Sequence, residues 1–299
     1  MPILPMSTPP SSQRPAVLAL LATVVIWAYS WIVMKQALRY AGAFDFAALR
    51  YLLGALLLFA LLALSRQSLR PPPLLLTVAI GLCQTAAFQG LEQWALLDAG
   101  AGRVALLAYT MPFWAVLLAW LLLRERPAPR HWLGLALAAL GLLCIIEPWR
   151  GLGHAGSNAL AIGGGAAWAA GTVLSKRMFQ RHAPSPLNLV AWQMLVGALA
   201  LGVAAWLLPQ RPIDWNWAFV GLLGYSAVLA SSVAWWLWSI VLQRLPTTLA
   251  SLSSLGVPLL SVLLAWLLLH ERPTPMEGVG MLLVLLGLLA VSGVRWRRG

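Results

Sequence analysis

Four polar side chains interrupt an apolar stretch of the sequence between residues 74 and 96: Gln84, Gln89, Glu92 and Gln93. The last three follow the i, i+3, i+4 spacing that places side chains on one face of an α-helix. Amides and a carboxylate facing hydrocarbon would be costly, so we expect this face to point into a cavity or a helix interface. A carboxylate there could bind an ammonium group or exchange a proton. Glu92 also nears the end of its stretch, where a glutamate at headgroup level would need no such role.

Aromatic side chains form a second set that could build a binding site. Most of the 17 tryptophans fit the usual place of tryptophan at bilayer interfaces. The candidates for a binding wall lie inside apolar stretches instead: Trp27, Tyr109, Trp168, Tyr225, Trp235 and Trp238. Such walls suit an apolar or aromatic ligand, and cation–π contact could hold its ammonium group. Ordinary packing between helices explains the same residues equally well.

Serines near these aromatic residues form a third set. Ser232 belongs to the stretch that contains Trp235 and Trp238, and Ser254 lies shortly before Pro258. Small residues followed by a proline permit close helix approach and free a backbone carbonyl, which could serve as a hinge or as a polar point of a cavity. Close packing is the simpler explanation for these serines.

Glycines and lysines in the apolar stretches have structural interpretations. Gly163, Gly164 and Gly165 are read as sites of close packing or bending. Lys35 and Lys176 end equivalent stretches, and we expect both to extend toward lipid headgroups.

The composition requires a lipid environment around these residues. With 61% hydrophobic and 9% charged residues, the chain cannot form one aqueous globule with a polar surface. A hydrocarbon layer about 30 Å thick needs roughly 20 apolar residues of helix. The sequence offers ten such stretches, at 16–36, 44–65, 74–96, 102–123, 131–148, 158–179, 187–208, 216–242, 248–269 and 276–294. We therefore expect an all-α membrane protein with ten transmembrane helices.

A repeated motif indicates how these helices are organised. Residues 120–129 read WLLLRERPAP, and residues 266–275 read WLLLHERPTP, 146 positions later. A proline precedes each copy by eight residues, at Pro112 and Pro258. Other matching pairs extend the repeat: Trp27 with Trp168, Lys35 with Lys176, Gly81 with Gly224, Gly134 with Gly280, and Gly141 with Gly287. The chain is therefore expected to contain two diverged copies of one unit.

The number of helices in each copy predicts their relative orientation. We place the copies at 16–148 and 158–294, with five helices in each. Because five is odd, the second copy enters the membrane from the opposite side, and the repeats are inverted. Inverted repeats are typical of secondary transporters, which bind substrate near the midplane and open alternately to each side.

Basic residues are interpreted as an orientation signal. The net charge is +12, which in a soluble protein would suggest nucleic acid. With the N-terminus in the cytoplasm, the inner loops carry thirteen lysines and arginines and the outer side seven, with Arg50 counted among the seven. The positive-inside rule then places both termini in the cytoplasm, and no nucleic-acid partner is expected. Residues 1–15, rich in proline and serine, are expected to be a flexible cytoplasmic tail.

These features together resemble a known family. Two five-helix copies, each with a proline-bearing fourth helix, a leucine-rich run into Glu-Arg and a fifth helix with two glycines seven positions apart, are similar to the EamA-type drug/metabolite transporter superfamily. The length and the abundance of tryptophan most resemble its YddG-type exporters of aromatic amino acids. The resemblance implies a ten-helix fold with a central cavity lined mainly by helices 1, 3, 4, 6, 8 and 9.

Other classes of function lack the residues that they need. No Ser/His/Asp, HExxH or paired-carboxylate arrangement is present, and no nucleotide-binding loop, so we expect neither an enzyme nor a bound cofactor or metal. A channel would need filter-like loops or charged rings. The sequence predicts an inner-membrane secondary transporter that exports amino acids, above all aromatic and hydrophobic ones, or similar small metabolites. The alternative is efflux of lipophilic cations or drugs, proton-coupled through Glu92. One chain, surrounded by lipid, is sufficient for either pathway.

Overall fold

The computed structural model of the protein describes residues 14–123, 129–147, 155–244 and 256–292. All regular structure in these ranges is helical. Six helical spans are long and apolar enough to cross a membrane: Leu18–Ala37, Ala43–Leu64, Leu74–Asp98, Ala101–Leu118, Pro186–Leu207 and Trp217–Val241. Shorter apolar helices cover Trp132–Ile145, Gly256–Leu269 and Pro275–Gly287. The prediction of an all-helical membrane protein is confirmed at this level.

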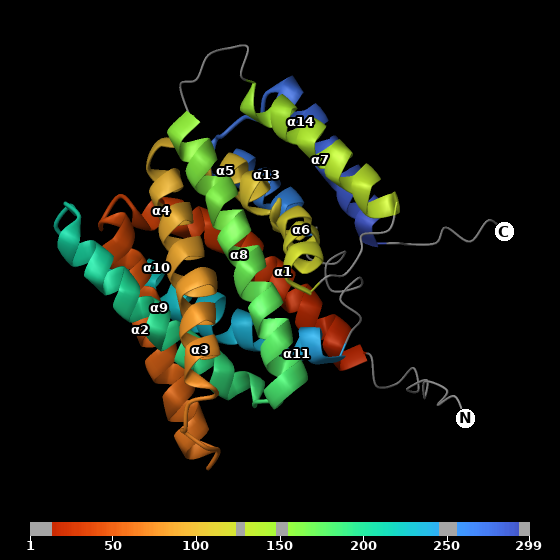
Figure 1. The fold of residues 1–299 in the computed structure, drawn as a ribbon. Coiled ribbons are helices and arrows are strands. Elements are labelled where there is room, and N and C mark those ends of the chain that lie inside the picture. Colours follow the sequence, from red (N-terminus) through yellow and green to blue (C-terminus); the bar gives the residue numbers. More distant parts are fainter. Residues whose placement is uncertain (1–13, 124–128, 148–154, 245–255, 293–299) are drawn as a thin grey trace, which may run out of the picture.

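The N-terminal half, residues 14–147, contains the warm-coloured helices of Figure 1. In chain order they are α1 (Arg14–Ala37), α2 (Ala43–Leu64), α3 (Leu74–Ile80), η2 (Gly81–Ala87), α4 (Phe88–Asp98), α5 (Ala101–Ala108), α6 (Met111–Leu123) and α7 (Pro129–Ile146). The elements α3, η2 and α4 follow one another without a break and form one rod.

In its described residues, 155–244 and 256–292, the C-terminal half follows a similar order. Its helices are α8 (Ala155–His182), α9 (Pro186–Leu207), α10 (Trp217–Tyr225), η4 (Ser226–Val233), α11 (Ala234–Arg244), α13 (Gly256–Leu269) and α14 (Pro275–Ser292). The expected tail up to residue 13, the motif residues 124–128 and the expected helix start at 248–255 lie outside the described residues.

A break divides the helix that was expected to run without interruption from 102 to 123. Pro112 has no backbone N–H, so it cannot donate to the carbonyl of Ala108, and its ring would clash with that group in a regular helix. The chain turns instead at Tyr109 and Thr110, where Thr110 N donates to Leu107 O at 3.2 Å and its hydroxyl donates to the same carbonyl at 2.7 Å. Tyr109 therefore lies at a break between two helices rather than inside one.

A second departure from regular helix occurs in both halves. The rod from Leu74 to Asp98 is π-helical over Gly81–Ala87, and the rod from Trp217 to Arg244 is π-helical over Ser226–Val233. Apolar periodicity predicted neither stretch. Such wide turns recur at functional sites, and here each stretch leads directly into the helix that carries Gln89 or Trp235.

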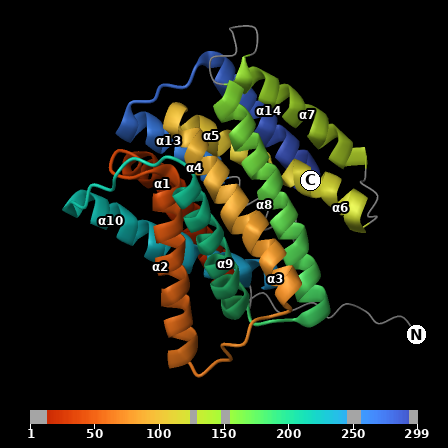
Figure 2. The same cartoon turned by 60° about the vertical axis from the view of Figure 1, so that its left-hand side comes forward.

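The two halves pack through pairs of equivalent helices. Helix α7 lies along α14, and α2 lies along α9 on the other side of the molecule, as both ribbon views show (Figures 1 and 2). Where α7 crosses α14, a Cβ added to Gly141 would lie 2.8 Å from Gly280 O, and one added to Gly280 would lie 2.6 Å from Gly141 O. Only glycine permits this approach, as is common between membrane helices.

Candidate functional site

Four tryptophans from both halves meet at the centre of the molecule. Trp27 of α1 contacts Trp168 of α8, with ring centroids 6.1 Å apart and nearly perpendicular planes. Trp235 and Trp238 of α11 lie 5.1 and 5.6 Å from Trp27. All four side chains are buried. The structure thus brings together residues that are up to 211 positions apart in the sequence.

Two further rings surround Trp168. Phe88 of α4 stacks on it at 4.8 Å, and Tyr109 meets it edge-on at 5.2 Å. The break before Pro112 ends α5 next to Tyr109. The Tyr109 ring lies there beside Trp168 of α8. The offset-stacked and edge-on arrangements are those that aromatic quadrupoles favour.

These rings enclose a small cavity of about 30 Å³. Its walls come from α1, α2, α4, α8, α11 and the break after α5, and the lining residues are Trp27, Ser30, Trp31, Met34, Arg50, Phe88, Gln89, Tyr109, Trp168 and Trp235. Such a space holds one or two water molecules. In this conformation the protein's own side chains fill the place that a larger ligand would need.

The Gln/Glu face of α4 points into the protein, as its spacing predicted. Gln89 lines the cavity, whereas Glu92 and Gln93 have no exposed surface and lie between helices. Glu92 packs against Gly164 of α8, where a side chain would collide with its carboxylate. Among the described residues, neither carboxylate oxygen of Glu92 has a hydrogen-bond partner.

Arg50 is a functional candidate that the sequence analysis missed. Its assignment to the charges of the outer side is wrong, because it lies within α2 and its surface is only 3% exposed. Arginine within a membrane helix costs about 2.5–3.5 kcal/mol on insertion scales, and such residues usually have a function. The available signal was its position six residues inside the apolar stretch 44–65.

Besides Glu92, three predicted site residues lie at helix contacts instead of the cavity. The Ser232 hydroxyl donates to Ala227 O and Gly54 O, at 2.8 and 3.2 Å, and so joins η4 to α2. Gln84 accepts a hydrogen bond from the Ser175 hydroxyl at 3.1 Å, between η2 and α8.

Tyr225, the third of them, donates from its hydroxyl to Ile26 O at 2.8 Å, between α10 and α1. Ser254 lies outside the described residues.

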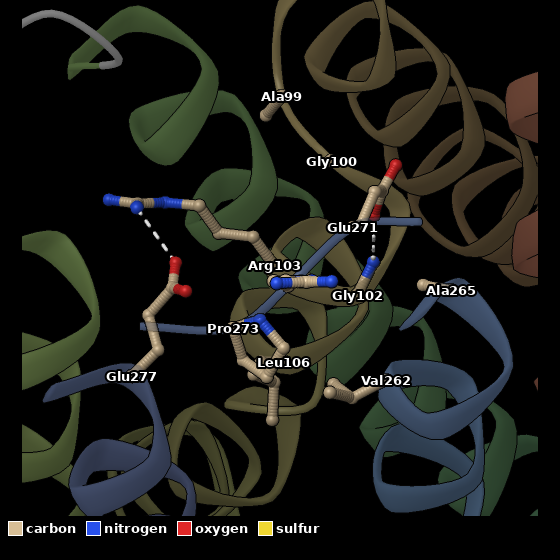
Figure 3. Close-up of a pocket in the computed structure, with 11 residues that line it drawn as sticks. Ala99, Gly100, Gly102, Arg103, Leu106, Val262, Ala265, Glu271, Pro273 and Glu277 are labelled. Carbon is tan, nitrogen blue, oxygen red and sulfur yellow. Dashed lines mark hydrogen bonds and ion pairs between the residues drawn. The ribbon is translucent and has the colours of Figure 1, made fainter. Parts of the chain in front are cut away.

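A polar cluster joins the halves at one end of the helices (Figure 3). Arg103 of α5 forms a 2.9 Å ion pair with Glu277 of α14 beside a cavity of about 210 Å³. The Glu271 carboxylate accepts from Gly102 N at 3.4 Å, at the positive N-terminal end of α5. This glutamate of the duplicated motif therefore contacts the other half. At the start of α14, Thr274 and Glu277 form a reciprocal capping box.

Lys35 was expected to extend toward lipid headgroups, but its ammonium group binds backbone carbonyls of the protein. Its ammonium group donates to Leu96 O and Ala99 O, at 2.5 and 2.8 Å, and thus caps the C-terminal end of α4. A cation there satisfies helix carbonyls that have no intrahelical partner. In the described part of the chain, no group of three or more His, Cys, Asp or Glu side chains could hold a metal ion.

Comparison with known proteins places this arrangement in a family. The EamA-like transporter family matches the chain twice, at residues 14–147 and 156–293. A probable amino-acid metabolite efflux pump of Escherichia coli (strain K12) is 29% identical, covering 96% of this chain and 98% of its own. An uncharacterised protein of Pseudomonas aeruginosa is 33% identical, with coverage of 96% and 97%. An uncharacterised transporter of Bacillus subtilis (strain 168) is 25% identical, with coverage of 91% and 94%.

A solved crystal structure shares the fold. It aligns with a TM-score of 0.66 at 21% identity and covers 92% of this chain and 95% of its own. The double family match also agrees with the duplicated WLLL motif, since the family matches each half once. The protein is a multi-pass membrane protein of two such units, and it belongs to the EamA-like transporter family.

Proposed function

We propose that the protein exports aromatic and other hydrophobic amino acids, or similar small amphipathic metabolites, across the inner membrane as a secondary transporter. The observation that carries this proposal is the aromatic cavity at the contact between the halves, which contains Trp27, Trp168 and Trp235 beside the polar groups of Gln89 and Arg50. Aromatic walls suit an apolar side chain, and the polar groups suit an amino acid's charged end. The name of the Escherichia coli relative, an amino-acid metabolite efflux pump, agrees with this class of substrate.

The proposed architecture is ten transmembrane helices in two inverted five-helix repeats. Contacts between helices occur in equivalent pairs, which supports a two-fold relation between the halves. The contact of α4 with α8 has its counterpart in that of α11 with α1, and the contact of α6 with α8 has its counterpart in that of α13 with α1.

A pair of glycines repeats this relation in detail. Gly54 of α2 packs against Ser231 and Ser232, and Gly197 of α9, 143 positions later, packs against Thr85 of η2. Each glycine thus lets a helix of its own half approach the π-helical stretch of the other half.

The proposal includes alternating access, and the small size of the cavity supports it. An amino acid is far larger than one or two waters, so we expect the halves to move apart to admit it. The Arg103–Glu277 and Glu271–Gly102 contacts hold one end closed, and breaking them would open that side.

The excess of basic residues in the inner loops favours cytoplasmic termini. The walls of the cavity come from one chain, so a monomer is sufficient.

Efflux of lipophilic cations, proton-coupled through Glu92, is the second candidate. The specific observation in its favour is the Glu92 carboxylate, which is buried beside Gly164 without a hydrogen-bond partner among the described residues. An acid at this depth could alternate between a proton and a cation. The aromatic walls would suit the cation as well.

Transport by the purified protein in liposomes tests both candidates. Labelled phenylalanine and tetraphenylphosphonium are compared, each with and without a pH gradient. The amino-acid proposal expects uptake of phenylalanine well above that of the lipophilic cation, and the alternative expects the reverse. Uptake of neither compound would reject both.

Substitution Glu92→Gln tests the coupling role. Glutamine keeps the shape and removes the exchangeable proton, so we expect the protein to fold and to lose any stimulation of transport by a pH gradient. Asp98→Asn is the matched control, because Asp98 is exposed at the end of the same helix and should change nothing. Wild-type rate and pH dependence in the Glu92→Gln variant would remove Glu92 from the mechanism.

A further inference from the structure

Arg50 is a buried cation whose charge no described residue balances. Two of its three nitrogens bind neutral groups: Nε donates to the Ser231 hydroxyl at 3.2 Å, and Nη2 donates to the Tyr51 hydroxyl at 3.3 Å. The third, Nη1, has no partner within the described ranges. No ion pair joins Arg50 to a carboxylate of these ranges. A guanidinium stays protonated in proteins and is normally paired when it is buried.

The surroundings of Arg50 fix the guanidinium in one orientation. Its carbon lies 4.8 Å from the ring centroid of Tyr51 and 5.9 Å from that of Phe46. Ser231 reaches it from η4 in the other half, so both halves hold the group. A cation that is held in place before a ligand arrives loses little freedom on binding.

Arg50 also borders the aromatic cavity. Arg50 lines the same space as Gln89, Tyr109 and Trp168. A ligand that bound Nη1 would therefore place the rest of its structure against the aromatic rings. The buried carboxylate of Glu92 is not among the residues that line this space.

We propose that Nη1 of Arg50 is the binding point for the substrate's carboxylate. The ligand class is a carboxylate with an apolar or aromatic body, because the planar guanidinium edge matches a carboxylate and the walls match the body. Tyr51 and Ser231 are positioning residues that orient the guanidinium. This inference rests on the proposed transport function and identifies which group on the substrate the site recognises.

Phenylalanine and phenylalaninamide form the matched pair of ligands for the test. The amide keeps the ring and the ammonium group and loses the negative charge. Transport is measured in liposomes, and binding to the purified protein is measured by tryptophan fluorescence, which the rings around the cavity should report. We expect the wild type to prefer phenylalanine by at least about tenfold, because a site built for a charged partner rejects analogues that lack it.

The Arg50→Gln variant should lose this preference. We expect binding and transport of phenylalanine to fall by at least about tenfold, while the amide changes by less than about twofold. Arg39→Gln is the charge-matched control, since Arg39 is exposed beyond the end of α1. If Arg50→Gln does not fold, Arg50→Lys keeps the charge without the planar edge, and it should reduce the preference for phenylalanine.

The outcomes separate this inference from the proposed function. Preferential binding of phenylalanine without transport would reject the transport function and keep the carboxylate site. Equal treatment of the two ligands by the wild type, or equal losses for both in the variant, would overturn the site and leave Arg50 a structural role.

Discussion

The two halves share their frame and differ in the polar groups that they bury. In the N-terminal half, α2 carries Arg50 and the rod from Leu74 to Asp98 carries Gln84, Gln89, Glu92 and Gln93. The corresponding stretch of the C-terminal half carries Ala227, Ser232, Trp235 and Trp236. Gln193 lies 143 positions after Arg50, the same offset as between Gly54 and Gly197. The N-terminal half thus supplies the buried charges, and the C-terminal half supplies most of the central tryptophans.

The comparison teaches where a duplicated protein is free to diverge. At Gly141 and Gly280 the halves meet backbone to backbone, so a larger residue there would push α7 and α14 apart. The buried charges of the N-terminal half, Arg50 and Glu92, lie at other positions, and the residues 143 positions later, Gln193 and Trp235, are uncharged.

The largest effect is expected from removing the tryptophan at the centre of the shared cavity. Trp168→Ala deletes a buried ring that contacts Trp27, Phe88 and Tyr109. We expect the free energy of unfolding to fall by about 3–5 kcal/mol, measured by denaturant titration in detergent. Trp217→Ala is the control, because this tryptophan is 91% exposed at the start of α10. A loss as small as that of the control would show that the cavity wall does not stabilise the fold.

The next effect tests whether the frame depends on contact between equivalent helices. In Gly280→Ala the new Cβ would meet the Gly141 carbonyl, so we expect a loss of about 1–3 kcal/mol in stability. Gly278→Ala, on the same helix, meets nothing within 4 Å and should be neutral or slightly stabilising. Substrate preference should remain unchanged in both variants. Equal thermal stability of the two variants would contradict the close contact of α7 with α14.

The smallest effect separates the two equivalent tryptophans. Trp27 Nε1 donates to Ala230 O at 3.1 Å, whereas Trp168 Nε1 has no partner among the described residues. Trp27→Phe should therefore cost about 1 kcal/mol more stability than Trp168→Phe, because it removes a buried hydrogen bond. The comparison uses the same unfolding assay for both variants. The reverse order would contradict this difference in hydrogen bonding between the two tryptophans.

Much of the local structure was predictable from the sequence. Apart from the expected start at 248, which lies outside the described residues, the ends of the expected stretches lie within three residues of helix ends in the structure. Long apolar runs between charged or proline-rich breaks leave few alternatives in a membrane. The inward face of Gln89, Glu92 and Gln93 followed from their spacing. The break at Tyr109 was less predictable, although Pro112 gave the signal. The π-helical stretches left no signal in the apolar pattern.

The site was predictable only in part. Trp27 and Trp168 were paired through the repeat, and the structure places their rings in contact. Ser232 and Gln84 were grouped with them because they are polar and lie on the same rods, but a small rotation about a helix axis decides whether a side chain meets a cavity or a neighbouring helix. Arg50 was missed because charge was assigned to loops before its position in the apolar stretch was considered.

By itself, the sequence determined the solvent, the helical class and the duplication, because composition, run length and repeated motifs are properties of the chain alone. Only the tertiary structure decided which buried groups meet. It placed Arg50 against Ser231, 181 positions away, and left Glu92 outside the aromatic cavity, against Gly164. The physical reason is that such contacts depend on helix rotation and approach, which close packing between the halves sets and which no local pattern encodes.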